Sequence, residues 1–205
     1  MSTNVNSNSS NSKMSRTFQA FTTMDIVLMA LLATANAVMT MYLGAVNQLL
    51  SSIGGPILTS TIVGLYMIYG LLACYIIRKP GTAVITYALG ALVQSFVGVS
   101  YGIASAFAAA ICYMLVAELL MAMTRYRRWS TGWMMLIGGA MVPIWFVVAV
   151  QMFGYAKWGM TILSIALVVR ILSGMLLCGL LTVVFAKAIG KTGLLRRFAG
   201  FNGRR

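Results

Sequence analysis

Side chains that could carry out a reaction are scarce in this chain. Its 205 residues include no histidine and only two acids, Asp25 and Glu118. The three cysteines, Cys74, Cys112 and Cys178, stand singly inside separate apolar runs and form no Cys-x-x-Cys pair. The lack of histidine excludes histidine-based nucleophilic sites and histidine metal sites. Two acids far apart in the sequence leave little for carboxylate pairs or for sites that bind hard cations. We expect no catalytic residue, no metal and no cofactor.

The polar and aromatic side chains are better suited to recognising a ligand. An amide can read the edge of a heterocycle with its donors and its acceptor, and aromatic rings stack on flat ligands. Such residues recur in the outer halves of the helices predicted below and in the outer loops that join them, where they predict a small outward-facing pocket. They are Asn47, Gln94, Tyr101, Trp145, Gln151, Tyr155 and Trp158. Interfacial anchoring is the alternative for each of the aromatic rings.

Two charged residues fall inside apolar runs. Arg170 lies about 15 Å along the last run at a rise of 1.5 Å per residue, near the bilayer midplane. A charge at that depth is costly unless it is paired or hydrated. We expect an intramembrane pair between Arg170 and Glu118 that links the fourth and sixth helices. Two alternatives remain open. Either residue could contact the ligand directly, or the Glu118 side chain could point toward Arg125 instead.

Composition indicates the elements that position these residues. Hydrophobic residues make up 60% of the chain, charged residues 8%, and the mean hydropathy is +0.92. Charged residues make up about 25% of an average soluble protein, and a membrane-spanning helix needs about 20 apolar residues. We predict an all-α, polytopic bundle of six transmembrane helices within residues 21–193, after a disordered segment at 1–20 and before a basic tail at 194–205. The predicted spans are 24–43, 56–77, 82–99, 102–123, 132–153 and 160–186.

The distribution of basic residues predicts the orientation. If the N-terminus lies inside, Lys157 is the single basic residue of the predicted outer loops. Arg170 lies within a predicted helix, and all other basic residues fall in inner segments. Basic residues collect in cytoplasmic loops, so we expect both termini in the cytoplasm of a bacterial cell and a net charge of +13 that needs no nucleic-acid partner. The inner segments hold Lys13, Arg16, Arg78, Lys79, Arg125, Arg127, Arg128, Lys187, Lys191, Arg196, Arg197, Arg204 and Arg205.

Small residues form a stripe on the first predicted helix. Ala30, Ala33 and Ala37 recur at helical spacing, and small residues let membrane helices approach closely. The stripe fits either packing within this chain or docking of another membrane subunit.

Several segments resemble YkoE-type substrate-binding subunits (S components) of energy-coupling-factor (ECF) transporters. The strongest are the run at 73–83, Ala-Cys-Tyr-Ile-Ile-Arg-Lys-Pro-Gly-Thr-Ala, and the run at 90–94, Gly-Ala-Leu-Val-Gln. Residues 25–29, 117–118 and 169–174 fit the same family. The resemblance implies a six-helix membrane protein that captures thiamine or its hydroxymethylpyrimidine precursor outside the cell. It also implies a T-type membrane subunit and cytoplasmic ATPases as partners, with Ala33 and Ala37 on the docking face.

The expected function is therefore capture of a vitamin for an ATP-driven importer, with no reaction on this chain. The resemblance leads us to expect an acid in some relatives where this chain has Gln94. Because no acid falls in the outer half of this chain, we expect neutral hydroxymethylpyrimidine to bind at least as tightly as cationic thiamine. The main alternative is a self-sufficient proton-coupled carrier in which Glu118 titrates and Arg170 modulates it. A membrane scaffold without a ligand is a further alternative.

Overall fold

The computed structural model describes residues 21–98, 101–195, 197, 198, 200 and 201, and these form helices and turns without a strand. The predicted disordered segment at 1–20 and the predicted helix end at residue 99 lie outside the described residues. In chain order the elements are α2 (Thr23–Thr59), η1 (Ser60–Ile62), α3 (Val63–Ile77), α4 (Thr82–Val97), α5 (Ile103–Met123), α6 (Thr131–Met152), η2 (Tyr155–Trp158), α7 (Met160–Ser173), η3 (Gly174–Leu180) and α8 (Leu181–Lys191).

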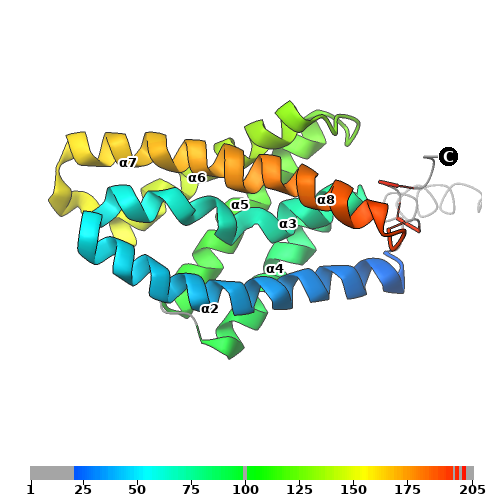
Figure 1. The fold of residues 1–205 in the computed structure, drawn as a ribbon, viewed down its shortest axis with the longest axis horizontal. Coiled ribbons are helices and arrows are strands. Elements are labelled where there is room, and N and C mark those ends of the chain that lie inside the picture. Colours follow the sequence, from blue (N-terminus) through cyan, green and yellow to red (C-terminus); the bar gives the residue numbers. More distant parts are fainter. Residues whose placement is uncertain (1–20, 99–100, 196, 199, 202–205) are drawn as a thin grey trace, which may run out of the picture.

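Helix α3 lies at the centre of the bundle. Figure 1 shows α2 along one side, the continuous rod formed by α7, η3 and α8 along the other, and α3 between them. Nearly all residues of α3 are buried, as expected for a helix that is apolar on every face. The start of α2 and the end of α8 lie at the same end of the molecule.

The first predicted span ends too early. We predicted an end at residue 43, but α2 continues because residues 44–53 contain no helix-breaking proline. Helical geometry is lost only at Gly54 and at Gly55, where φ is +56°, a value that glycine adopts at little cost. The chain reverses there and returns as α3 (Figure 1), so it does break between the first two predicted spans.

The alanine stripe of α2 faces into the chain. Ala33 and Ala37 are fully buried and Ala30 is partly buried. Their face continues through other buried positions of α2, including Met29 and Thr40, and α2 packs against α3 and α4. The stripe therefore serves internal packing, and the predicted docking face is covered by the protein's own helices.

The last predicted span forms one long rod with an unexpected π-helical segment. This segment, η3, packs closely against α6, where Gly138 and Gly174 bring the two backbones together. The Ser173 hydroxyl donates to the Thr61 carbonyl at 2.7 Å and accepts from the Gly64 amide at 3.0 Å. The rod is thus joined to the start of α3 as well as to α6.

Part of the predicted basic tail packs on the bundle. Leu195 and Phe198 are buried, and the Gly200 amide donates to the carbonyl of Ile76 at 3.1 Å. The described part of this segment is therefore anchored at the end of α3 by its apolar residues.

Length and hydropathy make this a membrane protein. Among the described residues, four helical stretches are long and apolar enough to cross a bilayer, namely Thr23–Ile77, Ile103–Met123, Thr131–Met152 and Met160–Lys191. The first of these contains the reversal at Gly54 and Gly55. Helix α4 is also apolar but has only 16 residues.

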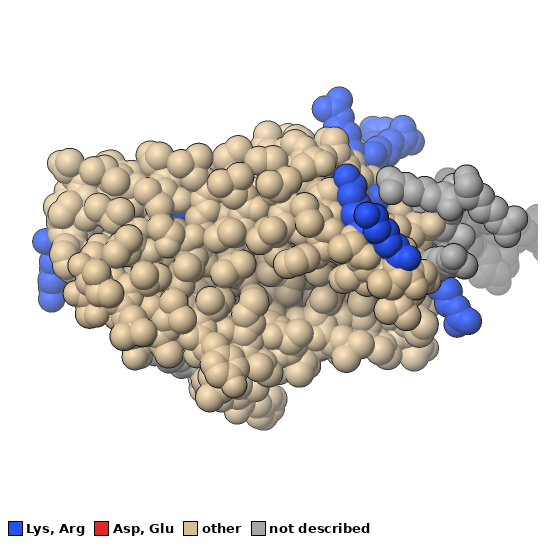
Figure 2. Space-filling view, viewed as in Figure 1, with Lys and Arg blue, Asp and Glu red and all other residues tan. Residues whose placement is uncertain are grey.

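Charge is segregated along the long axis. In Figure 2, basic side chains gather at one end, a smaller basic group marks the opposite end, and uncharged residues cover nearly all of the visible surface between them. The ends of α3 and α5, with the basic turns that follow them, lie at the same end of the molecule as the end of α8 (Figure 1), whereas Lys157 lies in η2. This segregation is typical of a membrane protein with one basic flank.

Candidate functional site

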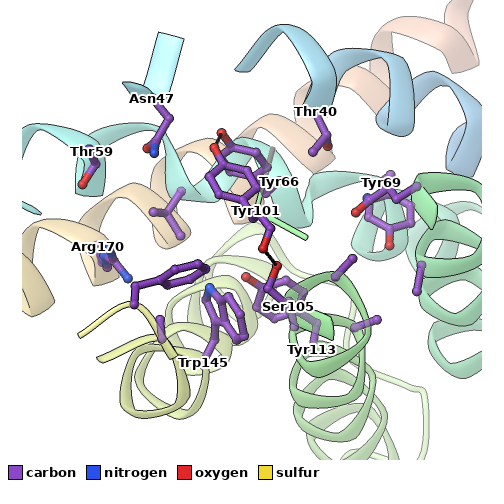
Figure 3. Close-up of a pocket in the computed structure, with 18 of the residues that line it drawn as sticks. Thr40, Asn47, Thr59, Tyr66, Tyr69, Tyr101, Ser105, Tyr113, Trp145 and Arg170 are labelled. Carbon is purple, nitrogen blue, oxygen red and sulfur yellow. Dashed lines mark hydrogen bonds between the residues drawn. The ribbon is translucent and has the colours of Figure 1, made fainter. Parts of the chain in front are cut away.

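A pocket lies among the helices, with about 810 Å³ of empty space, its open mouth included. Residues from α2 through α7 contribute to it, so the whole bundle is needed to form it. Its lining is Thr40, Asn47, Thr59, Val63, Tyr66, Tyr69, Ala91, Gln94, Tyr101, Ser105, Ala106, Ala109, Ala110, Tyr113, Trp145, Ala149, Phe153, Tyr155 and Arg170. Figure 3 shows the polar and aromatic members converging on the same space.

One wall of the pocket consists of four aromatic side chains, each in contact with the next. The hydroxyls of Tyr66 and Tyr101 are hydrogen-bonded at 2.5 Å, which joins α3 to the turn before α5. The Tyr101 ring lies edge-on to that of Phe153, with ring centroids 6.3 Å apart. The ring centroids of Phe153 and Tyr155 are 5.7 Å apart. These contacts hold three separate segments together around the pocket.

A second ring cluster forms the deeper wall. Tyr69, Tyr113 and Trp145 line the pocket, and Tyr87 lies behind them and donates to the Met67 carbonyl at 2.7 Å. Ring centroids are 5.0 Å apart for Tyr69 and Tyr87, 5.8 Å for Tyr87 and Tyr113, and 6.1 Å for Tyr113 and Trp145. This edge-on and tilted packing holds the rings that line the pocket in place.

Glycines make room for this cluster. A Cβ on Gly90 would lie 2.1 Å from the Tyr69 hydroxyl, and one on Gly70 would lie 2.3 Å from the Tyr87 ring. Each tyrosine therefore occupies space that a side chain on the neighbouring helix would take, which determines where Tyr69 meets the pocket.

The two lining amides are available to a ligand. Within the described part of the chain, the side chains of Asn47 and Gln94 form no hydrogen bond, and both are only partly buried. Ser105 and Thr59, by contrast, donate to nearby carbonyls of their own chain. Asn47 and Gln94 thus supply both donors and acceptors next to the rings.

Arg170 lies in the pocket lining and does not pair with Glu118. Its side chain is buried, its Nε donates to the Ser60 hydroxyl at 2.9 Å, and its guanidinium carbon lies 4.9 Å from the centre of the Phe146 ring. The predicted intramembrane pair is wrong because packing turns the arginine toward α6 and η1.

Glu118 joins two turns at the basic end of the molecule. Its carboxylate accepts from the Gly81 amide at 2.6 Å and from the Tyr126 hydroxyl. Burial, and then the carboxylate itself, raise the pKa of Tyr126, so this phenol stays a donor at neutral pH. Glu118 is not among the described residues that line the pocket, so its contact with a ligand stays a prediction.

The other predicted site residues divide into two groups. The structure places Asn47, Gln94, Tyr101, Trp145 and Tyr155 together in the lining. Gln151 and Trp158 are absent from the described lining. Gln151 is exposed at the end of α6, and the Trp158 ring packs against Gly55, 3.2 Å from the position of a Cβ there.

Sequence reasoning missed several lining residues. Tyr66, Tyr69 and Tyr113 fall within apolar runs, and Thr40 and Phe153 lie beside them in the pocket. A usable signal was present, because a tyrosine deep in an apolar span needs a partner for its hydroxyl. Tyr66 and Tyr69 are also three residues apart, which places them on one side of a helix.

Comparison with known proteins gives consistent matches. A family model for the permease component of ABC-type cobalt transport systems matches residues 24–145. The HMP/thiamine permease protein YkoE of Bacillus subtilis (strain 168) is 31% identical over 175 residues, which cover 85% of this chain and 87% of that protein. A crystal structure of an S-component of an ECF transporter superposes with a TM-score of 0.82 at 30% identity, covering 88% of this chain and 91% of that one.

Proposed function

Because this chain belongs to the YkoE-type family of ECF transporter S components, we propose that it captures hydroxymethylpyrimidine or thiamine for an ATP-driven importer. The pocket is the observation that carries the proposal. Seven of its lining residues are aromatic, and two lining amides have no partner in the described chain. The pyrimidine ring common to both compounds would stack on those rings and exchange hydrogen bonds with the amides.

The side chains that line the pocket are poorly suited to binding cobalt as a transported substrate. The chain has no histidine, and neither its two acids nor its three cysteines belong to the described pocket lining. Cobalt and similar ions need imidazole, thiolate or carboxylate ligands. An organic heterocycle suits this pocket better.

The proposed topology has six spans and both termini in the cytoplasm. Helices α2 and α3 would count as two spans, α4 as a short third, and the rod from α7 to α8 as the last. The basic end of the molecule would face the cytoplasm under the positive-inside rule. Residues 21–193 would then form one membrane domain.

The proposed cycle assigns recognition alone to this chain. A ligand would enter the pocket from outside, and a T-type membrane subunit with cytoplasmic ATPases would drive reorientation and release. ATP hydrolysis would take place on those partners, and no bond would be made or broken here.

Calorimetry on the purified protein tests the proposal. We expect saturable binding of hydroxymethylpyrimidine and of thiamine, with the tighter of them at a Kd of about 1 μM or below, equivalent to about −8 kcal/mol. Hydroxymethylpyrimidine is expected to bind at least as tightly as thiamine. Pyridoxine, a heterocycle of similar size without an aminopyrimidine, serves as the control. Absence of binding by both compounds would contradict the proposal.

A substitution at Glu118 separates this proposal from a proton-coupled carrier. Glutamine keeps an oxygen that accepts from the Gly81 amide and the Tyr126 hydroxyl, so Glu118→Gln should leave ligand binding within about threefold. Glu118→Ala leaves both donors without a partner and should cost about 1–3 kcal/mol of stability.

Transport by reconstituted vesicles gives the decisive comparison. The importer proposal requires partner subunits and ATP, with Glu118→Gln still active in the assembled complex. A carrier that depends on titration of Glu118 would instead transport without an ATPase and would lose transport in Glu118→Gln.

A further inference from the structure

The pocket contains one formal charge that no acid of this chain balances. Arg170 is the single charged residue in the described lining, and it is 5% exposed. The chain has two acidic side chains. Asp25 pairs with Lys79 at 2.7 Å, and Glu118 is held by Gly81 and Tyr126. Neither carboxylate neutralises the guanidinium.

Neutral groups hold the guanidinium in place. Its Nε donates to the hydroxyl of Ser60, which itself donates to the Pro56 carbonyl. The guanidinium carbon lies 4.9 Å from the centre of the Phe146 ring and 5.8 Å from that of Tyr155. Arginine stays protonated in proteins, and this guanidinium already lies over the ring of Tyr155, which lines the pocket.

A positive charge in a low-dielectric pocket repels a second one. Interactions between charges are much stronger in such surroundings than in water. The other polar lining groups are hydroxyls, an indole and the amides of Asn47 and Gln94, all of them uncharged. Aromatic faces could attract a cation, but Arg170 competes for that of Tyr155.

We propose that Arg170 makes this pocket select uncharged heterocycles over cationic ones. The inference rests on the proposed function and specifies the charge of the ligand that the pocket prefers. Between the two compounds named there, the pocket would favour hydroxymethylpyrimidine, which is neutral, over thiamine, whose thiazolium ring carries a fixed positive charge. Guanidinium N–H groups would also attract an oxygen acceptor on the ligand.

A pair of ligands that differ in charge alone tests the selection. Deazathiamine replaces the thiazolium ring of thiamine with a neutral thiophene of nearly the same shape. Calorimetry on the wild-type protein should show deazathiamine binding at least tenfold more tightly than thiamine, a difference of about 1.4 kcal/mol.

Two variants identify the source of the selection. Arg170→Met removes the charge and should bring the affinity ratio of the two ligands close to one. Gln94→Glu keeps the shape of the side chain and adds a negative charge to the lining, so the ratio should shift toward thiamine by tenfold or more. Gln94→Glu also decides the matter if Arg170→Met does not fold.

The outcomes are distinguishable. Wild-type protein that binds thiamine as tightly as deazathiamine would overturn the selection but leave the proposed function intact, as would an unchanged ratio in Gln94→Glu. Wild-type protein that binds neither of these ligands nor hydroxymethylpyrimidine would overturn both proposals.

Discussion

Replacing Gly138 with leucine is expected to prevent stable folding of the bundle. A Cβ at this position would lie 2.5 Å from the Gly174 carbonyl oxygen and 2.9 Å from the Gly179 amide nitrogen. Both neighbours are backbone atoms of η3, so no side chain can rotate away. Overpacking typically costs about 1–3 kcal/mol, and we expect more here because two helix backbones must separate. The midpoint of thermal unfolding, followed by size-exclusion chromatography in detergent, measures the loss.

Gly132 offers a matched control in the same helix. It also lies in α6, but a Cβ there would meet no atom within 4 Å. Gly132→Leu should therefore leave the unfolding midpoint nearly unchanged. Equal midpoints for the two variants would show that α6 and η3 do not approach as closely as described.

Filling the pocket from the α5 alanines that line it, Ala106, Ala109 and Ala110, should abolish ligand capture. Ala109 lies on α5, lines the pocket and is only partly buried. Ala109→Phe would place a ring in the space that we assign to the ligand, so affinity should fall at least 100-fold, or about 2.7 kcal/mol. Calorimetry with hydroxymethylpyrimidine measures the effect, and the unfolding midpoint reports whether the bundle stays intact.

Ala104 provides the corresponding control. It lies on the same helix but is exposed and outside the described lining. Ala104→Phe should bind the ligand as the wild type does. If Ala109→Phe retains normal affinity while remaining folded, the ligand binds elsewhere.

Several helices begin or end where glycine or proline stands at the edge of a predicted span. The turn around Pro80 and Gly81 separates α3 from α4, in the gap between the predicted spans 56–77 and 82–99. Gly102 precedes α5, and Ser130 caps α6 through the amide of Trp133 at 3.4 Å. These signals depend on residues close in sequence, and long-range packing changed them little.

Position along a helix proved a poor guide to side-chain partners. Depth suggested that Arg170 could reach Glu118, but depth does not specify which way a residue faces around the helix axis. Arg170 faces Ser60 and Phe146, while Glu118 faces the turn at Gly81. The same limit applied to Ala33 and Ala37, because their spacing fits internal packing as well as docking.

The sequence alone determined that this chain is an all-helical membrane protein, since hydropathy and helix-breaking residues act locally. The lack of histidine also excluded histidine-based catalysis and histidine metal ligands. Only the tertiary structure decided that tyrosines such as Tyr69 and Tyr113 share a pocket with Arg170. The rotation of each helix about its axis depends on close contacts such as that of Gly138 with Gly174, between residues far apart in the chain.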